Sequence, residues 1–203
     1  MSQPLLLIGC GGHARSMIDV VESSDHWHVL GLAGLSEQVG VEVLSYPVLG
    51  SDQDLPSLRE QCAHALLAVG QLGLPSSRQR LVLELKRLEF LMPVVISGRA
   101  HVSRHAQLGV GISVGHGVIV NAGACVGDYC ILNSNALIEH DAVIGDFCHI
   151  STGALVNGGA KIGNSSFIGS GAVLREGIDL PPQTVISAGK RVMGWPLREK
   201  NTK

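Results

Sequence analysis

The chain has 203 residues, of which 45% are hydrophobic, 3% aromatic and 16% charged, and its formal net charge at pH 7 is −2. This composition disfavours a nucleic-acid-binding protein, which would show a basic excess and stacking aromatic residues, and five Cys are too sparse for a secreted disulfide scaffold. Glycine is the anomaly, because its 26 residues are nearly twice the usual share of roughly 7%.

Targeting and membrane signals are weak. The first residues, MSQPLLLIGCGG, have no basic segment, and their apolar run is short for a signal peptide. Residues 105–127 contain no Asp, Glu, Lys or Arg, a length that resembles a membrane span, but Gly, Asn, Ser and His interrupt them at a fixed interval. We therefore expect a cytoplasmic protein without a membrane span, whose Cys residues are reduced and fill apolar positions.

The first half of the chain predicts a small α/β domain. Strands are expected at residues 4–9, 27–35, 65–70 and 92–96, helices at residues 15–21, 51–62 and 75–88, and a turn at residues 46–50. The last helix is amphipathic and basic, and alternation of strands with helices implies a parallel, Rossmann-like sheet. We place this domain at residues 1–93 and a second domain at residues 94–203.

A glycine-rich segment, Gly9 to Ala14, follows the first predicted strand and opens the first helix. It fits the looser dinucleotide fingerprint G-x-G-x-x-A, in which the turn and the helix N-terminus favour a phosphate. The acidic residue expected about 20 positions later is absent, because the second strand ends with Ala33 and Gly34. NAD is therefore disfavoured, and another nucleotide or a tight turn without a ligand stays open.

The second half of the chain repeats every six residues. From Val102 to Val192, sixteen consecutive sixth positions are Val, Leu or Ile, the residue two before is usually small, and the residue just after is often Gly or Asn. A helix repeats at 3.6 residues and a strand at 2, so one short strand and one tight turn per repeat are indicated. We expect the Gly and Asn residues to adopt the left-handed turn conformation. Stacked repeats would then bury the aliphatic side chains in a parallel β-helix.

Beyond the repeats, residues 194–196 predict a turn, and residues 197–203 predict a frayed, charged tail.

Five of the nine His residues lie in the repeats or lead into them, and one of them stands in an unusual turn. Glu139-His140-Asp141 places three ionisable residues where most turns carry Gly, Asn or Ser. A carboxylate beside an imidazole holds its tautomer and raises its basicity, which suits a general base near neutral pH. The alternative is a solvated surface turn of mixed charge.

A three-His zinc site, as in the gamma-class carbonic anhydrases, is disfavoured by spacing. That pattern has two His five residues apart and a third further along the chain. Here His101 and His105 are four apart, and His140 and His149 are nine apart. We therefore expect no metal.

Four motifs together resemble a known family. They are Leu7 to His13 (LIGCGGH), Pro47 to Ser51 (PVLGS), Ile138 to Asp141 (IEHD) and Phe147 to Ser151 (FCHIS). With the repeats, they are similar to the sugar O- and N-acyltransferases of the sialic acid O-acetyltransferase type. These include bacillosamine and perosamine acetyltransferases, and the resemblance covers nearly the whole chain. It implies a left-handed β-helix, acetyl-CoA as cosubstrate, and a homotrimer with active sites between adjacent β-helices.

The resemblance also implies roles for individual residues. His140 matches the catalytic base and Asp141 its acidic neighbour. The sugar-nucleotide site is matched by Gly11, Gly12, His13, Gly70 and Asn133. The acetyl-CoA site is matched by His149, Ser170, Ala188, Gly189 and Lys190. No metal is implied for the transfer.

The resemblance implies an acetyl-CoA-dependent N-acetyltransferase that acts on a UDP-, GDP- or dTDP-linked amino sugar in surface glycan synthesis. Two alternatives stay open. One is O-acetylation of a sialic acid or another sugar, which the same base could serve. The other is a non-catalytic trimeric scaffold that binds a sugar nucleotide, since a fold does not determine a function. Relatives that bind UDP-sugars carry acidic residues where this chain has Ala33 and Gly34, so the base and the sugar are not assigned.

Overall fold

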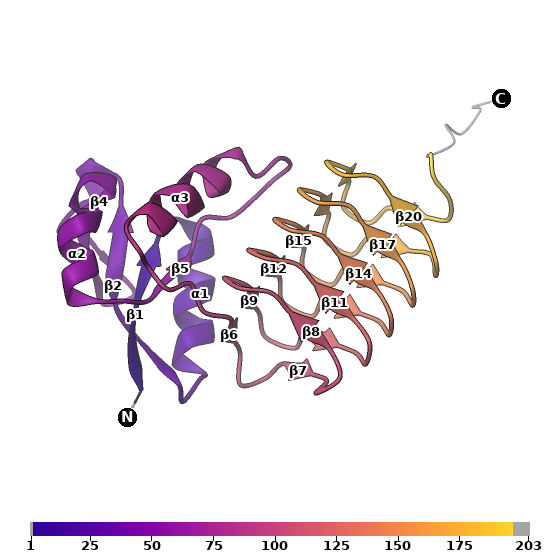
Figure 1. Ribbon diagram of the computed structural model, residues 1–203, viewed down its shortest axis with the longest axis horizontal. Coiled ribbons are helices and arrows are strands. Elements are labelled where there is room, and N and C mark those ends of the chain that lie inside the picture. The colour runs from indigo at the N-terminus through magenta and orange to yellow at the C-terminus, as the bar shows by residue number, and fades with distance from the viewer. Residues whose placement is uncertain (1, 197–203) are drawn as a thin grey trace.

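The computed structural model describes residues 2–196, which form an α/β unit followed by a β-helix (Figure 1). In the α/β unit, the strands lie in the order β3-β4-β2-β1-β5. Their bounds are Gln3–Ile8 for β1, Trp27–Gly34 for β2, Glu42–Val43 for β3, Tyr46–Ser51 for β4 and Ala65–Leu67 for β5. The helices are α1 (Gly12–Glu22), α2 (Leu55–Gln61) and α3 (Ser76–Arg87), with short 3-10 helices η1 (Ser36–Gln38) and η2 (Asp52–Asp54).

The sheet differs from the sequence prediction in two places. The strand expected at residues 92–96 is not part of it, because Val95 and Ile96 pair within the β-helix. The turn expected at residues 46–50 is wrong, because these residues belong to β4, which pairs in parallel with β2 and buries Val48 in the core. The two-residue edge strand β3 runs antiparallel to β4. Pro47 lies near the start of β4, before its register with β2 begins at Val48, where the missing N–H of proline is tolerated. The helix expected from residue 51 begins at Leu55, after η2.

Each turn of the β-helix consists of three two-residue strands and spans 18 residues, so Ser113 pairs with Ile131 and Ile131 with His149. The strands form three parallel sheets. The first sheet contains β6 (Val95–Ile96), β9 (Ser113–Val114), β12 (Ile131–Leu132), β15 (His149–Ile150), β18 (Phe167–Ile168) and β21 (Val185–Ile186). The second contains β7 (His101–Val102), β10 (Ile119–Val120), β13 (Leu137–Ile138), β16 (Leu155–Val156), β19 (Val173–Leu174) and β22 (Arg191–Val192). The third contains β8 (Gln107–Leu108), β11 (Cys125–Val126), β14 (Val143–Ile144), β17 (Lys161–Ile162) and β20 (Asp179–Leu180).

The predicted fold class, a small α/β domain followed by a left-handed β-helix, is confirmed. The aliphatic residue of each repeat points inward, and together with the small residue two positions before it forms one continuous core. Cys130 and Cys148 occupy two of these small positions and are buried, and all five Cys are free thiols.

The left-handed conformation was expected at the Gly and Asn residues directly after the aliphatic residue, and this position is wrong. Left-handed backbone recurs three residues after most of the aliphatic residues, at Gly117 and Gly123 and also at Asn135 and Asp141. Glycine directly after the aliphatic residue serves close packing instead. A Cβ on Gly127, for example, would lie 2.8 Å from the backbone N of Asp146 in the next coil, and neither backbone can move without disturbing the stack.

At the end of the β-helix, residues 194–196 form a bend, whereas the predicted tail at residues 197–203 lies outside the described residues. No helix within residues 2–196 is both long and apolar enough to cross a membrane.

Candidate active site

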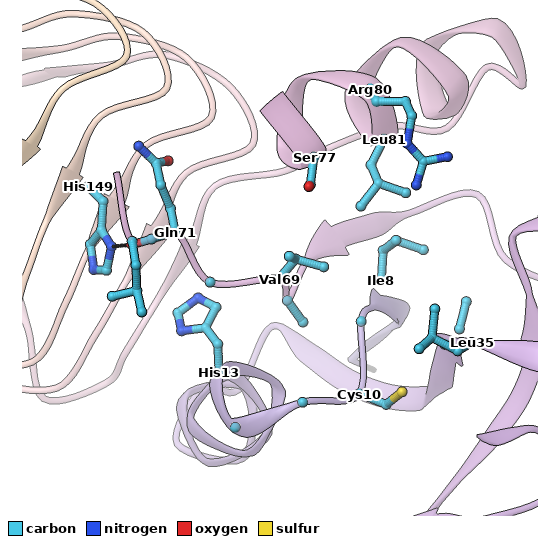
Figure 2. A pocket seen from close by; sticks show the side chains of 18 of the residues that line it. Ile8, Cys10, His13, Leu35, Val69, Gln71, Ser77, Arg80, Leu81 and His149 are labelled. Carbon is cyan, nitrogen blue, oxygen red and sulfur yellow. Dashed lines mark hydrogen bonds between the residues drawn. The ribbon is translucent and has the colours of Figure 1, made fainter. Parts of the chain in front are cut away.

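A cavity of about 790 Å³ lies between the carboxyl edge of the α/β sheet and the β-helix (Figure 2). In open parallel sheets, ligands bind in the crevice outside the carboxyl ends of the strands. Here the ends of β1, β2 and β5 form the floor, α3 contributes Ser77 and Arg80, and the β-helix contributes Asn133, His149 and Ser151.

The glycine turn lies at the centre of this cavity. Gly9 has a φ of +117°, and a Cβ there would lie 2.7 Å from Val69 Cγ2 on the neighbouring segment, so only glycine fits. Gly11 is the N-cap of α1, and both Gly11 and Gly12 face open space. The first N–H groups of a helix lack intrahelical partners and favour an anion. The turn therefore presents to the cavity a helix N-terminus whose N–H groups favour an anion.

His149 closes the cavity on the β-helix side, with 5% of its surface exposed. Its Nδ1 lies 2.7 Å from the carbonyl oxygen of Gln71. Because a carbonyl only accepts, Nδ1 carries the proton, and Nε2 accepts a hydrogen bond from the Asn133 amide at 3.3 Å. Burial, and then the nearby Arg78 guanidinium, lower the pKa of His149 to about 4, so it is neutral at pH 7.

Arg78 joins the two units behind the cavity wall. Its side chain is buried, and it donates to the carbonyl of Val69 at 2.6 Å and to the carbonyl of Tyr129 at 2.8 Å. Burial lowers the pKa of Arg78 to about 10. Burial, and then the positive charge of Arg78, lower the pKa of His13 to about 4. Arg78 was not among the residues predicted for the site, although it lies three and seven residues before Leu81 and Leu85, on the buried face of α3.

Two buried polar atoms beside the cavity are unsatisfied. His13 Nε2 and Gln71 Oε1 have no hydrogen-bond partner within residues 2–196. Both residues line the cavity, and His13 points into it from the first turn of α1 (Figure 2). Buried polar atoms are nearly always hydrogen-bonded, so this wall is suited to a polar ligand.

His140 lies in the turn between β13 and β14, outside the cavity. Its Nδ1 is 2.9 Å from Asp141 Oδ2. Asp141 has a φ of 60°, a left-handed conformation that Asp and Asn tolerate better than most residues. The hydrogen bond that His140 donates to Asp141, and then the charges of Asp141, Glu139 and Glu176, raise the pKa of His140. This arrangement holds the proton on Nδ1 and leaves the Nε2 lone pair as the basic atom.

Gly158, one coil further along, provides the space for this imidazole. A Cβ on Gly158 would lie 2.7 Å from His140 Nε2. With Glu139, Asn157 and Glu176, these two residues line a groove of about 510 Å³. Gly158 was not among the predicted site residues, although the residue 18 positions after any turn residue lies above it in a β-helix.

The predicted site residues fall into three places. Gly11, Gly12, His13, Gly70, Asn133 and His149 line the one cavity. Ser170, Ala188, Gly189 and Lys190 follow β18 and β21, on the same corner of the β-helix as Asn133, and Ser170 Oγ lies 2.9 Å from Ser151 Oγ of the cavity wall. His140 and Asp141 lie on the next corner, so a single chain does not bring the predicted base to the cavity.

Several cavity residues were missed by sequence analysis. They are Cys10, Leu35, Gln38, Asp52, Gln71, Leu72, Ser77, Arg80 and Ser151. Gln71 follows the end of β5, so the rule that strand ends meet at one edge would have found it. Asp52 follows β4, which the sequence pattern had predicted to be a turn. No group of three His, Cys, Asp or Glu in the described part of the chain is placed to hold a metal ion.

Comparisons with known proteins agree with this architecture. The PglD N-terminal domain matches residues 4–85, and the bacterial transferase hexapeptide family (six repeats) matches residues 141–176. No curated protein sequence matches the chain.

Solved structures match over nearly the full length. A histidine variant of perosamine N-acetyltransferase from Caulobacter crescentus, in complex with CoA and GDP-perosamine, is 31% identical with a TM-score of 0.87, covering 94% of this chain and 88% of that one. The acetyltransferase domain of PglB from Neisseria gonorrhoeae, in complex with acetyl coenzyme A, is 28% identical with a TM-score of 0.84, covering 95% and 93%. WeeI from Acinetobacter baumannii, at 21% identity and a TM-score of 0.72, covers 97% of this chain and 99% of its own and shares the fold.

The buried histidine at the cavity predicts a pH-dependent stability. The unfolded chain protonates His149 near pH 6.5 and the native chain only near pH 4, so its contribution is complete above about pH 6.5 and is lost as the pH falls toward 4. At pH 5 the loss is on the order of 1–2 kcal/mol. Urea unfolding at pH 7 and pH 5 measures it. The pH difference should shrink in His149→Gln and stay unchanged in His26→Gln, whose side chain is exposed. An equal pH difference in all three proteins would contradict the assignment.

Proposed function

The chain belongs to the family of acetyl-CoA-dependent sugar acetyltransferases that join a PglD N-terminal domain to a hexapeptide β-helix, and we propose that it N-acetylates a nucleotide-linked amino sugar. The observation that carries this proposal is the cavity, where an anion-binding helix end lies beside two unsatisfied buried polar atoms, His13 Nε2 and Gln71 Oε1. Relatives solved with CoA and GDP-perosamine, or with acetyl coenzyme A, support both substrates.

The sugar nucleotide would lie along the cavity floor. Its diphosphate would meet the N–H groups at Gly11 and Gly12, where the helix end favours negative charge. Gly70 gives close access at the end of β5, because a Cβ there would already contact the His13 side chain at 3.4 Å. The sugar would then extend toward His149, at the β-helix end of the cavity (Figure 2). Asn133, whose amide lies 3.3 Å from His149 Nε2, lines the same end.

Acetyl-CoA would lie along the corner of the β-helix that continues from this end. Ser170, Ala188 and Gly189 are turn residues there, and they offer backbone groups and little side-chain bulk to the pantetheine arm. Lys190 would meet the phosphates of CoA as a mobile cation. His149 is neutral and presents no charge to the thioester.

In the proposed reaction, the sugar amine attacks the thioester carbonyl carbon while His140 Nε2 takes its proton. The C–N bond forms, the C–S bond breaks, and the CoA thiolate leaves with the proton that His140 returns. The products are an amide and CoA thiol. Asp141 accepts the Nδ1–H of His140 at 2.9 Å, which keeps the Nε2 lone pair available and stabilises the imidazolium as it forms.

Because His140 and the cavity lie on different corners of one chain, we propose that a second copy completes the site, in a homotrimer. The outward residues of the β7–β22 sheet support this assembly, since Ile119, Leu137, Leu155 and Val173 are stacked in register. The β8–β20 sheet carries Gln107, Lys161 and Asp179 at the equivalent outward positions. An aliphatic stripe of this kind favours burial against another copy.

The general base is tested by His140→Ala. We expect turnover to fall about 10²–10⁴-fold while CoA binding changes little, because the variant removes only proton transfer. Release of CoA thiol from acetyl-CoA, with UDP-, GDP- and dTDP-linked amino sugars and with sialic acid, measures the activity. An undiminished rate would refute the mechanism. Transfer to sialic acid alone would favour the O-acetyltransferase alternative. The absence of thiol release with every acceptor would favour a non-catalytic scaffold that binds a sugar nucleotide.

The role of Asp141 is tested by its pH profile. The raised pKa of His140 means that the neutral base forms only at higher pH, so kcat/KM should rise with pH through a value above 6.5. In Asp141→Asn this limb should move toward lower pH, while kcat falls because the tautomer is no longer held. Asn also tolerates left-handed backbone, which keeps the turn intact. If the rise of kcat/KM stays at the same pH in Asp141→Asn, Asp141 does not raise the pKa of the catalytic base.

The proposed assembly is tested by Ile119→Asp. A carboxylate in the aliphatic stripe would be desolvated without a partner, so we expect smaller assemblies by light scattering and a loss of activity. Val143→Asp is the matched control, because Val143 is 40% exposed on the β8–β20 sheet and Ile119, on the stripe, is exposed to the same extent. A monomeric wild-type chain with full activity would overturn the between-subunit site.

A further inference from the structure

The end of the cavity farthest from the β-helix carries polar groups that the proposed reaction does not use. Strands β2 and β4 are neighbours and end together, with Gly34 opposite Ser51. Gln38 follows β2 and Asp52 follows β4, so both lie at this edge, and both line the cavity with Leu35. Figure 2 shows Leu35 at the opposite end of the cavity from His149.

The end of β2 has no room for the acidic side chain that dinucleotide-binding sheets carry there. A Cβ on Gly34 would collide with Cys10 Sγ and lie 3.3 Å from Gln38 Oε1. The carboxylate at this end of the cavity comes instead from Asp52, on the neighbouring strand end. Only the tertiary structure reveals this replacement, because Asp52 is 18 positions further along the chain than Gly34.

The Gln38 amide has a defined orientation. Its Oε1 accepts hydrogen bonds from Leu35 N at 3.0 Å and from Cys10 Sγ at 3.0 Å. A backbone N–H can only donate, so the amide cannot be flipped, and its NH₂ group is the part left to meet a ligand. This end of the cavity therefore offers one fixed donor, from Gln38, and one carboxylate acceptor, from Asp52.

The position of Asp52 indicates which part of a nucleotide it meets. An acid at the end of β2 contacts the ribose, and Asp52 lies one strand further from the glycine turn, a step of roughly 4.8 Å. That step leads past the ribose to the base. Arg80 Nη2 lies 3.4 Å from Asp52 Oδ2 and orients the carboxylate from the α3 side.

We propose that Asp52 and Gln38 select guanine as the base of the sugar nucleotide, an inference that rests on the proposed function. Guanine presents two adjacent donors, N1–H and the N2 amino group, which both oxygens of a carboxylate can accept together, and the neighbouring O6 accepts from the Gln38 amide. Uracil and thymine present a single N–H between two carbonyl oxygens, so the second carboxylate oxygen would face a carbonyl oxygen. The pair therefore attracts guanine and repels the pyrimidines.

The experiment compares GDP with UDP on the full chain, by calorimetric binding and by kcat/KM with the corresponding amino sugars. We expect the wild type to prefer GDP. In Asp52→Asn the preference should fall by about 10- to 100-fold, through weaker binding of GDP, with UDP binding unchanged or tighter. Gln38→Glu should act in the same direction, because it keeps the oxygen that holds Leu35 and places a second oxygen against O6. Glu37→Gln is the control, since Glu37 is exposed and lies outside the cavity.

Tighter binding of UDP than of GDP by the wild type would overturn the proposal. An equal loss of GDP and UDP affinity in Asp52→Asn would also overturn it, because that result places the carboxylate on the ribose. Preferred binding of GDP without acetyl transfer to any GDP-linked amino sugar would support base selection and refute the proposed N-acetyltransferase. The two hypotheses therefore fail on different readouts.

Discussion

The register of the 18-residue coil is the constraint on which the rest of the molecule depends. Each two-residue strand pairs with the strand 18 positions further along, so a side chain has its neighbours above and below determined by the backbone ladder. His140 lies over Gly158 in this way, and His149 lies beside Phe167, with ring centroids 5.2 Å apart. Because the core of the β-helix is close-packed, the position of a turn residue relative to the other coils is fixed.

The cavity depends on a second contact, between the α/β unit and the first coils of the β-helix. Arg78 satisfies two carbonyls, one from each unit, at the cost of burying a charge. The carbonyl of loop residue Gln71 accepts a hydrogen bond from His149 Nδ1, and its amide donates to the carbonyl of Phe147 at 3.2 Å. These contacts hold the carboxyl edge of the sheet against Asn133 and His149. The His149 end of the cavity and the glycine turn thus belong to different units of the molecule.

Electrostatics divides the histidines of the site into two kinds. His13 and His149 are desolvated and have pKa values lowered to about 4, so they act as neutral hydrogen-bonding groups. His140 is exposed beside Asp141 and has a raised pKa. The same residue type is therefore less basic than usual in one place and more basic than usual in the other, and the difference arises from burial and from a neighbouring carboxylate.

The sequence by itself determined the β-helix, because sixteen aliphatic residues at a period of six leave one way to bury them, and it also located the glycine turn and the His140–Asp141 pair. It misplaced β4, because Pro47 and Gly50 are typical of a turn and only pairing with β2 makes them a strand. The tertiary structure alone decided that Arg78 is buried, that Gly158 makes room for His140, and that Asp52 supplies the carboxylate missing from β2. Each of these depends on contacts between segments distant in the chain, and local periodicity carries no information about such contacts.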